Sequence, residues 1–181
     1  MSRHVEIEAA RSLLLNQSSA ALATLSAKMD GHPFVSSVDY LSNEKGEALI
    51  LISQLAEHTR NIQADARVSL LVQDSPDWHD ASLPHPCPPP KGEGGAGSLR
   101  EFRVRNVQAS PRLTLIGLAE AVSASEMPAE KRRYLSLFPD AEDYFSLDFG
   151  LYLVRPIQLR YVGGFGIARW IAPGALIDNP T

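Results

Sequence analysis

The sequence is divided into short apolar segments of strand length that alternate with turn-forming residues. Asp30-Gly31 and the stretch Asn43–Gly46 are the clearest of these turn signals. Many short strands with few helices between them favour a barrel or sandwich over a parallel sheet built from strand–helix–strand units. We therefore predict a mainly β (β+α) fold with strands at Ala20–Leu25, Phe34–Leu41, Ala48–Ile52, Val68–Val72, Arg112–Ala124 and Phe149–Val162.

Three of these strands carry further detail. The continuous apolar run Ala48–Ile52 predicts a strand that is buried on both faces. Gly117 lies in the middle of its strand and indicates a bulge or bend. Pro156 lacks a backbone donor and predicts an interruption of the last strand.

Helical periodicity is confined to a few segments. Val5, Ala9, Leu13 and Asn16 are spaced as one stripe of a helix over His4–Asn16. Further helices are predicted at Gln54–Ala64, with Leu55, Thr59 and Ile62 on its buried side, at Met127–Leu137, and as a short turn near Ala141–Phe145.

One stretch interrupts the strand pattern. The residues from about 75 to 110 have no sustained apolar period, and their centre reads LPHPCPPPKGEGGAG. Such a composition cannot bury enough apolar surface to offset the entropy of ordering it. We predict one domain over residues 1–181 that carries this Pro/Gly-rich stretch as a disordered insertion. His79, His85 and Cys87 within it fit no standard zinc spacing, so no metal site is expected.

Charge and hydropathy exclude several classes of protein. The net charge is -4 and no basic face stands out, which argues against nucleic-acid binding. No apolar run is long enough for a signal peptide or a membrane span. Cys87 is the single cysteine, so an intrachain disulfide is excluded. These features together predict a cytoplasmic protein.

The segment Ser53–Asp65 combines a strand end with a polar helix start. A hydroxyl at Ser53 can cap the helix or turn toward a ligand, and the first helical turn offers free amides and a positive dipole end. Four consecutive polar side chains follow, of which the guanidinium of Arg60 can hold a phosphate with two hydrogen bonds. From periodicity alone, a phosphate site and a merely solvent-facing polar helix both remain open.

The run SQLAEHTRNIQADARVSLLV resembles a conserved block of the pyridoxamine 5′-phosphate oxidase-like split-barrel proteins, in their HugZ-like (heme iron utilisation) branch. Further matching pieces lie in order along the chain, before and after this run, among them DGHPFVSSVDY, PRLTLIGLAEAV and VGGFGIARWI. The resemblance implies a six-stranded antiparallel split barrel with peripheral helices, and a homodimer with FMN in a groove at its interface. By the same resemblance, the cofactor-binding residues are Ser36, Ser37, Ser53, His58, Thr59, Arg60 and Asn61.

The sequence also departs from the family pattern. Val35–Val38 contains no arginine or lysine, although the oxidases carry a basic pair on this strand. This argues against true pyridoxamine-phosphate oxidase activity. Heme-handling members carry an extra C-terminal domain, and the sequence stops at Thr181, which implies a member without it. In the block from Gly163 to Ile171, Phe165 and Trp170 suit either ring stacking or packing at a dimer interface.

Three functions are compatible with these features. The main hypothesis is an FMN-binding, flavin-dependent oxidoreductase, in which the cofactor supplies the chemistry. The alternatives are a heme-binding or heme-utilisation protein and a non-catalytic, flavin-binding dimeric module. No residue stands out as an acid–base catalyst, and substrate and electron donor are not determined by the sequence.

Overall fold

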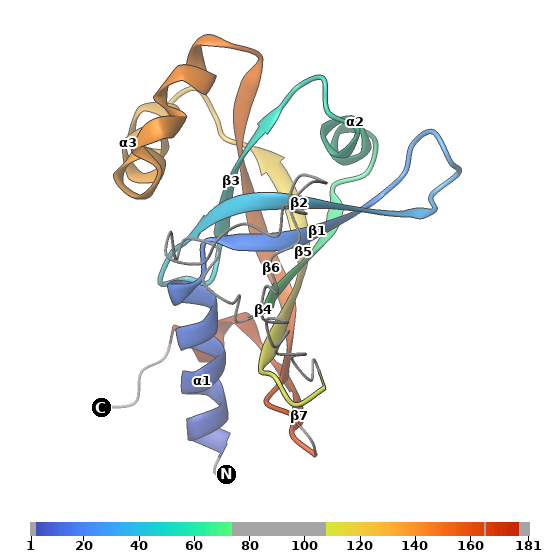
Figure 1. Cartoon of the computed structure of the whole chain (residues 1–181), viewed down its shortest axis with the longest axis vertical. Helices are drawn as coiled ribbons and strands as arrows, with labels where there is room; N and C mark the ends of the chain where they lie inside the picture. The colour runs from blue at the N-terminus through green and yellow to red at the C-terminus, as the bar shows by residue number, and fades with distance from the viewer. Residues whose placement is uncertain (1–2, 74–107, 165, 178–181) are drawn as a thin grey trace, which may run out of the picture.

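A computed structural model describes residues 3–73, 108–164 and 166–177. Within these residues, seven strands form one antiparallel sheet in the order β3-β2-β1-β4-β5-β6-β7, and an additional pairing of β3 with β6 closes the first six into a barrel. The strands are β1 (Ser19–Leu25), β2 (Pro33–Ser42), β3 (Ala48–Ser53), β4 (Arg67–Gln73), β5 (Arg112–Ala121), β6 (Phe149–Val162) and β7 (Ala168–Ile171). The predicted six-stranded antiparallel barrel is confirmed, and β7 extends it beyond β6 (Figure 1).

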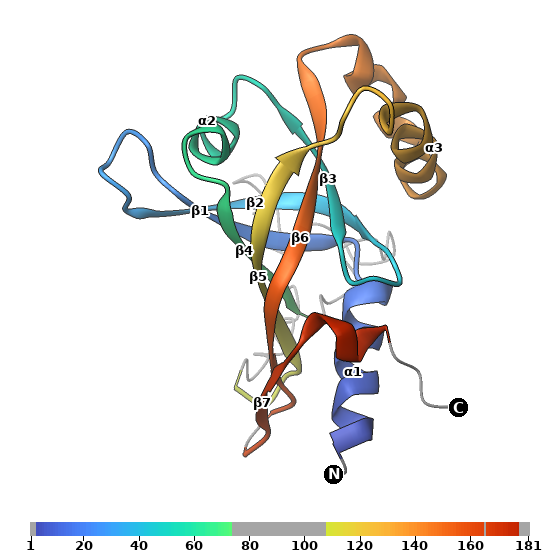
Figure 2. The same ribbon diagram turned by 180° about the vertical axis from the view of Figure 1, so that it is seen from behind.

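Helices cover the two ends of the barrel. The helix α1 (Arg3–Asn16) and the 3-10 helix η2 (Pro173–Leu176) lie at the end where both termini are found, whereas α2 (Glu57–Ala64) and α3 (Met127–Leu137) lie at the other end (Figures 1 and 2). The 3-10 helix η1 (Pro139–Ser146) follows α3 directly. Pro128 occupies the first turn of α3, where its missing N–H costs no hydrogen bond.

Alternation along the strands fills the barrel. In β1, Ala20, Leu22 and Thr24 are buried, and β4 and β5 show the same period of two. Strand β3 differs because its buried residues are consecutive, as predicted. Its inward residue Ile50 joins the barrel core, whereas its neighbour Leu49 packs in a second cluster with Tyr134 of α3.

The irregularity predicted at Gly117 is present. The register of the β5–β6 ladder shifts between Ile116 and Gly117, where Gly117 faces Pro156 and Ile116 faces Gln158. A Cβ on Gly117 would lie 2.2 Å from the carbonyl oxygen of Arg155. The close approach of the two backbones therefore requires glycine. β6 continues through Pro156, so the predicted interruption is a shift in register and not an end of the strand.

The buried stripe predicted for the first helix is wrong in register. Glu6, Ala10, Leu13 and Leu14 are the buried residues of α1, whereas Val5 is 44% exposed. Glu6 is buried because its carboxylate pairs with Arg169 of β7, a partner 163 positions away in the chain. The face of α1 that turns inward thus combines an ion pair across the fold with the apolar residues Ala10, Leu13 and Leu14.

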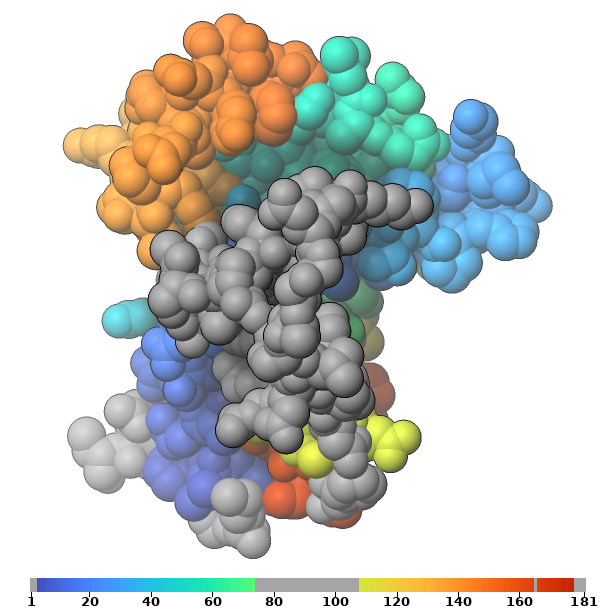
Figure 3. Space-filling model, in the orientation of Figure 1, coloured from blue at the N-terminus to red at the C-terminus, as the bar shows by residue number. Residues whose placement is uncertain are grey.

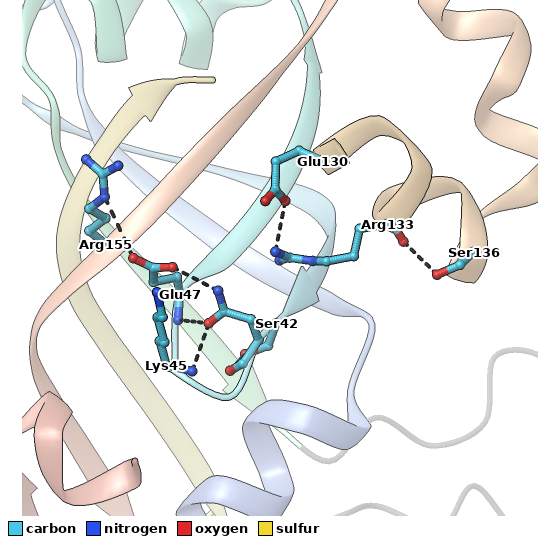
Figure 4. A network of polar contacts seen from close by, with 8 residues as sticks. Ser42, Lys45, Glu47, Glu130, Arg133, Ser136 and Arg155 are labelled. Atoms are coloured by element: carbon cyan, nitrogen blue, oxygen red, sulfur yellow. Dashed lines mark hydrogen bonds and ion pairs between the residues drawn. The ribbon is translucent and has the colours of Figure 1, made fainter. Parts of the chain in front are cut away.

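A polar network fixes the turn between β2 and β3. The side-chain oxygen of Asn43 accepts hydrogen bonds from the backbone amides of Lys45 and Glu47, each at 3.0 Å. Its amide group donates to the carboxylate of Glu47, which also lies 3.7 Å from the guanidinium of Arg155 on β6 (Figure 4). The predicted turn at Asn43–Gly46 is thus confirmed, and β6 helps to hold it.

Candidate functional site

A cavity of about 810 Å³ lies outside the barrel, between β2 and β3 on one side and α3 and η1 on the other. In the space-filling view, α3 and η1 lie beside β3 and α2 at one end of the molecule (Figure 3). The cavity volume of about 810 Å³ is in the range of cofactor sites. The cavity is lined by Ser18, Ser37, Val38, Asp39, Leu51, Ile52, Ser53, Ala56, His58, Tyr134, Leu137, Phe138, Pro139, Asp140, Ala141, Tyr144 and Phe149.

Strand alternation selects which side chains reach the cavity. On β2, Ser37 and Asp39 are exposed, whereas the neighbouring Val38 and Tyr40 are buried. The aromatic residues Tyr134, Phe138 and Tyr144 come from α3 and η1, whereas Phe149 begins β6 and pairs with Ser53 of β3. The rings of Tyr144 and Phe149 stack with their centroids 4.9 Å apart. The helical side of the cavity is therefore mainly aromatic, and most of the polar lining residues lie on the strand side.

His58 is the histidine that lines this cavity. Its Nδ1 lies 3.0 Å from the hydroxyl oxygen of Ser36 on β2, so the ring is held at one edge. Its Nε2 is buried, and within the part of the chain that the structure describes it has no hydrogen-bond partner. Burial lowers the pKa of His58 below its usual value, so the ring is neutral at neutral pH. A neutral imidazole held at one nitrogen can bind a metal through the other, and because Nε2 of His58 is buried, a ligand would reach it only by displacing the groups that cover it.

Ser53 does not cap α2, contrary to our expectation. The helix begins at Glu57 rather than Gln54, and its N-cap residue is Ala56, which makes no side-chain cap. Ser53 is still paired in the β3–β6 ladder, and a turn separates it from the helix. Leu55, predicted on the buried side of the helix, lies in this turn and is 70% exposed.

The hydroxyl of Ser53 has local partners instead. It donates to Oδ2 of Asp148 at 2.5 Å and accepts a hydrogen bond from the backbone amide of Leu55 at 3.1 Å. This hydrogen bond holds the pKa of Asp148 below its usual value, so its carboxylate is charged at neutral pH. Ser53 therefore lines the cavity while it is engaged by an acidic side chain.

Thr59 and Asn61 are fully buried and bind the protein itself. The hydroxyl of Thr59 donates to the backbone oxygen of Ser53 at 2.6 Å. The side chain of Asn61 donates to the hydroxyl of Thr24 and accepts from the backbone amide of Ala27, each at 2.9 Å. These two residues attach α2 to β3 and to the end of β1, and neither lines the cavity.

Arg60 lies on the exposed side of α2. Its guanidinium is 3.5 Å from the carboxylate of Glu57, one turn earlier, and it is not part of the cavity lining. Among the predicted site residues, Ser37, Ser53 and His58 thus line the cavity. Ser36 does not line it, but its hydroxyl contacts Nδ1 of His58. Cofactor binding by the seven residues that the resemblance implies remains a prediction.

The described lining contains two carboxylates, those of Asp39 and Asp140, and neither lysine nor arginine. A phosphate group needs cationic or amide donors, so the described lining does not form the basic cradle that FMN would require. The aromatic wall was not foreseen, although the segment from Tyr134 to Phe149 is visibly rich in aromatic residues. What the sequence did not reveal is that this segment folds back over β3.

Several expectations fall outside what the structure describes. The predicted insertion at about 75–110 lies outside the described residues except for its last three, and Phe165 lies outside them as well. Trp170 is 54% exposed, with the guanidinium of Arg160 5.2 Å from its ring centre. In the described ranges no cluster of His, Cys, Asp or Glu suits a metal ion, and no helix could cross a membrane.

Known proteins share this architecture. The curated non-canonical heme oxygenase HOZ of the Arabidopsis thaliana chloroplast is 26% identical over 162 residues, which is 90% of this chain but 41% of that protein. The heme binding protein from Mycobacterium smegmatis is 26% identical with a TM-score of 0.72, over 98% of this chain and 62% of that one. HutZ from Vibrio cholerae, described as a heme storage protein, is 25% identical with a TM-score of 0.59, over 88% and 94% of the two chains.

The family model that describes the CREG β-barrel matches residues 2–177, which is nearly the whole chain. Together with the closed six-stranded sheet, this match agrees with the resemblance found in the sequence. The chain belongs to the CREG β-barrel family of pyridoxamine 5′-phosphate oxidase-like split barrels.

Proposed function

We propose that this protein binds heme in the cavity between β2–β3 and α3–η1, with His58 as the residue that contacts the iron. The observation that carries the proposal is the imidazole of His58, which is neutral, oriented through Nδ1 by Ser36 and left without a partner at Nε2. Histidine is a common axial ligand of heme iron. When bound, the heme would supply redox-active iron at this site.

The remaining lining supports a flat, largely apolar ligand. Tyr134, Phe138, Tyr144 and Phe149 provide aromatic surface, and Leu51 and Leu137 add aliphatic surface. Binding sites for cofactors are typically apolar with a few placed polar groups. The names of the three relatives mention heme, which agrees with this chemistry.

A hemin titration of the purified full-length protein tests the proposal. We expect a saturable Soret shift in the wild type, and loss of the histidine-ligated spectrum in His58→Ala that free imidazole restores. His32→Ala is the matched control, because His32 is exposed in the β1–β2 turn. An unchanged spectrum in His58→Ala would refute the assignment of His58, and absence of any saturable shift would refute heme binding.

FMN is the second ligand that we propose to test, since the sequence resemblance implies it. The same absorption measurement separates the two, because flavin gives a yellow protein without a Soret band. Flavin uptake at micromolar concentration without hemin uptake would favour the flavin-dependent oxidoreductase. Uptake of flavin that no donor reduces faster than free FMN would favour the non-catalytic module.

We further propose that the protein is a homodimer, as the resemblance implies. Two apolar side chains near the site support a partner surface: Val35 on the outward face of β2 is 62% exposed, and Leu55 is 70% exposed. Large apolar side chains exposed to solvent are common at interaction sites. Sedimentation of the full-length protein should give twice the chain mass, and a monomer at all concentrations would refute the proposal.

A further inference from the structure

The connection between β3 and α2 directs two hydrogen-bond donors at one carboxylate. Oδ2 of Asp148 accepts from the hydroxyl of Ser53 at 2.5 Å and from the backbone amide of Leu55 at 3.3 Å. The amide of Gln54 also donates to the backbone oxygen of Asp148, at 2.8 Å. Asp148 directly precedes β6 and lies 95 positions from Ser53, so the contact is made only by the fold.

A hydroxyl and a main-chain amide that converge just before a helix are donors of the kind that bind anions. Here the bound anion is a side chain of the protein. Both hydrogen bonds to the Asp148 carboxylate are solvent-exposed, so the carboxylate can leave these donors without opening a buried void. An exposed carboxylate on this pair is therefore open to competition from a dissolved anion.

The position of Asp148 relates this contact to the cavity. Its hydrogen-bond partner Ser53 and the residue that follows it, Phe149, both line the cavity, so Asp148 lies at the edge of the lining. The charged groups of the lining itself are the carboxylates of Asp39 and Asp140. An anionic ligand group that approached this end would meet like charge, and its natural donors would already be occupied.

We propose that Asp148 is a specificity-determining residue: an internal anion that occupies the donors of Ser53 and Leu55 and keeps anionic ligand groups away from this end of the cavity. The inference rests on the proposed ligand cavity and deepens it. The phosphate of FMN would be disfavoured at the turn where family resemblance expects it.

Inorganic phosphate is the probe, measured by calorimetric titration of the full-length protein. Asp148→Asn removes the charge and keeps the shape, and Asp148→Ala removes the acceptor altogether. We expect either variant to bind phosphate about tenfold more tightly than the wild type, because a contacting like charge has been removed. Asp143→Asn is the matched control, since Asp143 is an exposed carboxylate of η1 and its loss changes the net charge equally.

Adding Ser53→Ala to Asp148→Ala should reduce the gain, because the hydroxyl donor is then absent and only the Leu55 amide remains. Equal gains in Asp143→Asn and Asp148→Asn would overturn the proposal, as would a gain that Ser53→Ala leaves undiminished. Folded Asp148 variants, shown by circular dichroism, that bind phosphate no better than the wild type would overturn it too. The titration contains no heme, so its result is separate from that of the hemin titration.

Discussion

Asn61→Ala tests whether a polar residue of the candidate motif serves folding or binding. The side chain of Asn61 is fully buried and bridges α2 to the end of β1 through Thr24 and Ala27. Truncation would leave the hydroxyl of Thr24, which is 2% exposed, without this partner. The amide of Ala27 belongs to an exposed residue and can be solvated by water.

The expected cost follows from these two environments. A buried polar group left unsatisfied costs about 1–3 kcal/mol, and a hydrogen bond that water can replace contributes about 1 kcal/mol. Asn61→Ala should therefore lower the free energy of unfolding by about 2–4 kcal/mol. For a chain of this size, that corresponds to a fall in Tm of about 4–16 °C.

Urea denaturation of the full-length protein, followed by circular dichroism, measures this loss. Gln63→Ala is the control, because Gln63 lies on the exposed side of the same helix and its hydrogen bond to Gln54 is solvent-exposed. We expect the control to stay within about 0.5 kcal/mol of the wild type. If Asn61→Ala were as stable as the control yet lost ligand affinity, Asn61 would contact the ligand and the reasoning would be refuted.

Two further perturbations test the fold. The hydrogen bond from Arg169 lowers the pKa of Glu6, so its contribution to stability is present above the ordinary glutamate pKa and is lost as the pH falls through the folded pKa. The stability gap between wild type and Glu6→Gln in urea titrations should therefore narrow on acidification, and a gap independent of pH would contradict this. Gly117→Ala should cost about 1–3 kcal/mol in thermal unfolding, because its Cβ would meet the carbonyl of Arg155. Gly174→Ala, where a Cβ meets nothing within 4 Å, is the control, and equal losses in both would contradict the argument.

The strands were predictable because their signals are local. Alternation along β4 and β5 and the continuous apolar run in β3 each report on the immediate surroundings of a strand. Gly117 was also predictable as an irregularity, since a glycine within a strand commonly marks a bulge or a close backbone approach.

The start of α2 was not predictable from the same kind of signal. Polar residues from Ser53 onward suit a helix start, yet pairing of Ser53 with Phe149 extends β3 to that residue. The helix then begins only at Glu57. Long-range strand pairing therefore overrides the local preference for a serine cap.

The sequence by itself determined the mainly β class of fold, most of the short strands and the segment around which a site forms, whereas no local pattern indicates the pairing of β3 with β6 that closes the barrel. Only the tertiary structure decided which polar residues of that segment are free to bind. Asn61 is engaged by Thr24 and Ala27, and Ser53 is engaged by Asp148, whereas Nε2 of His58 has no partner within the described residues. The physical reason is that hydrogen-bond partners are brought together by strand pairing and helix packing over long separations in the chain, which no local pattern records.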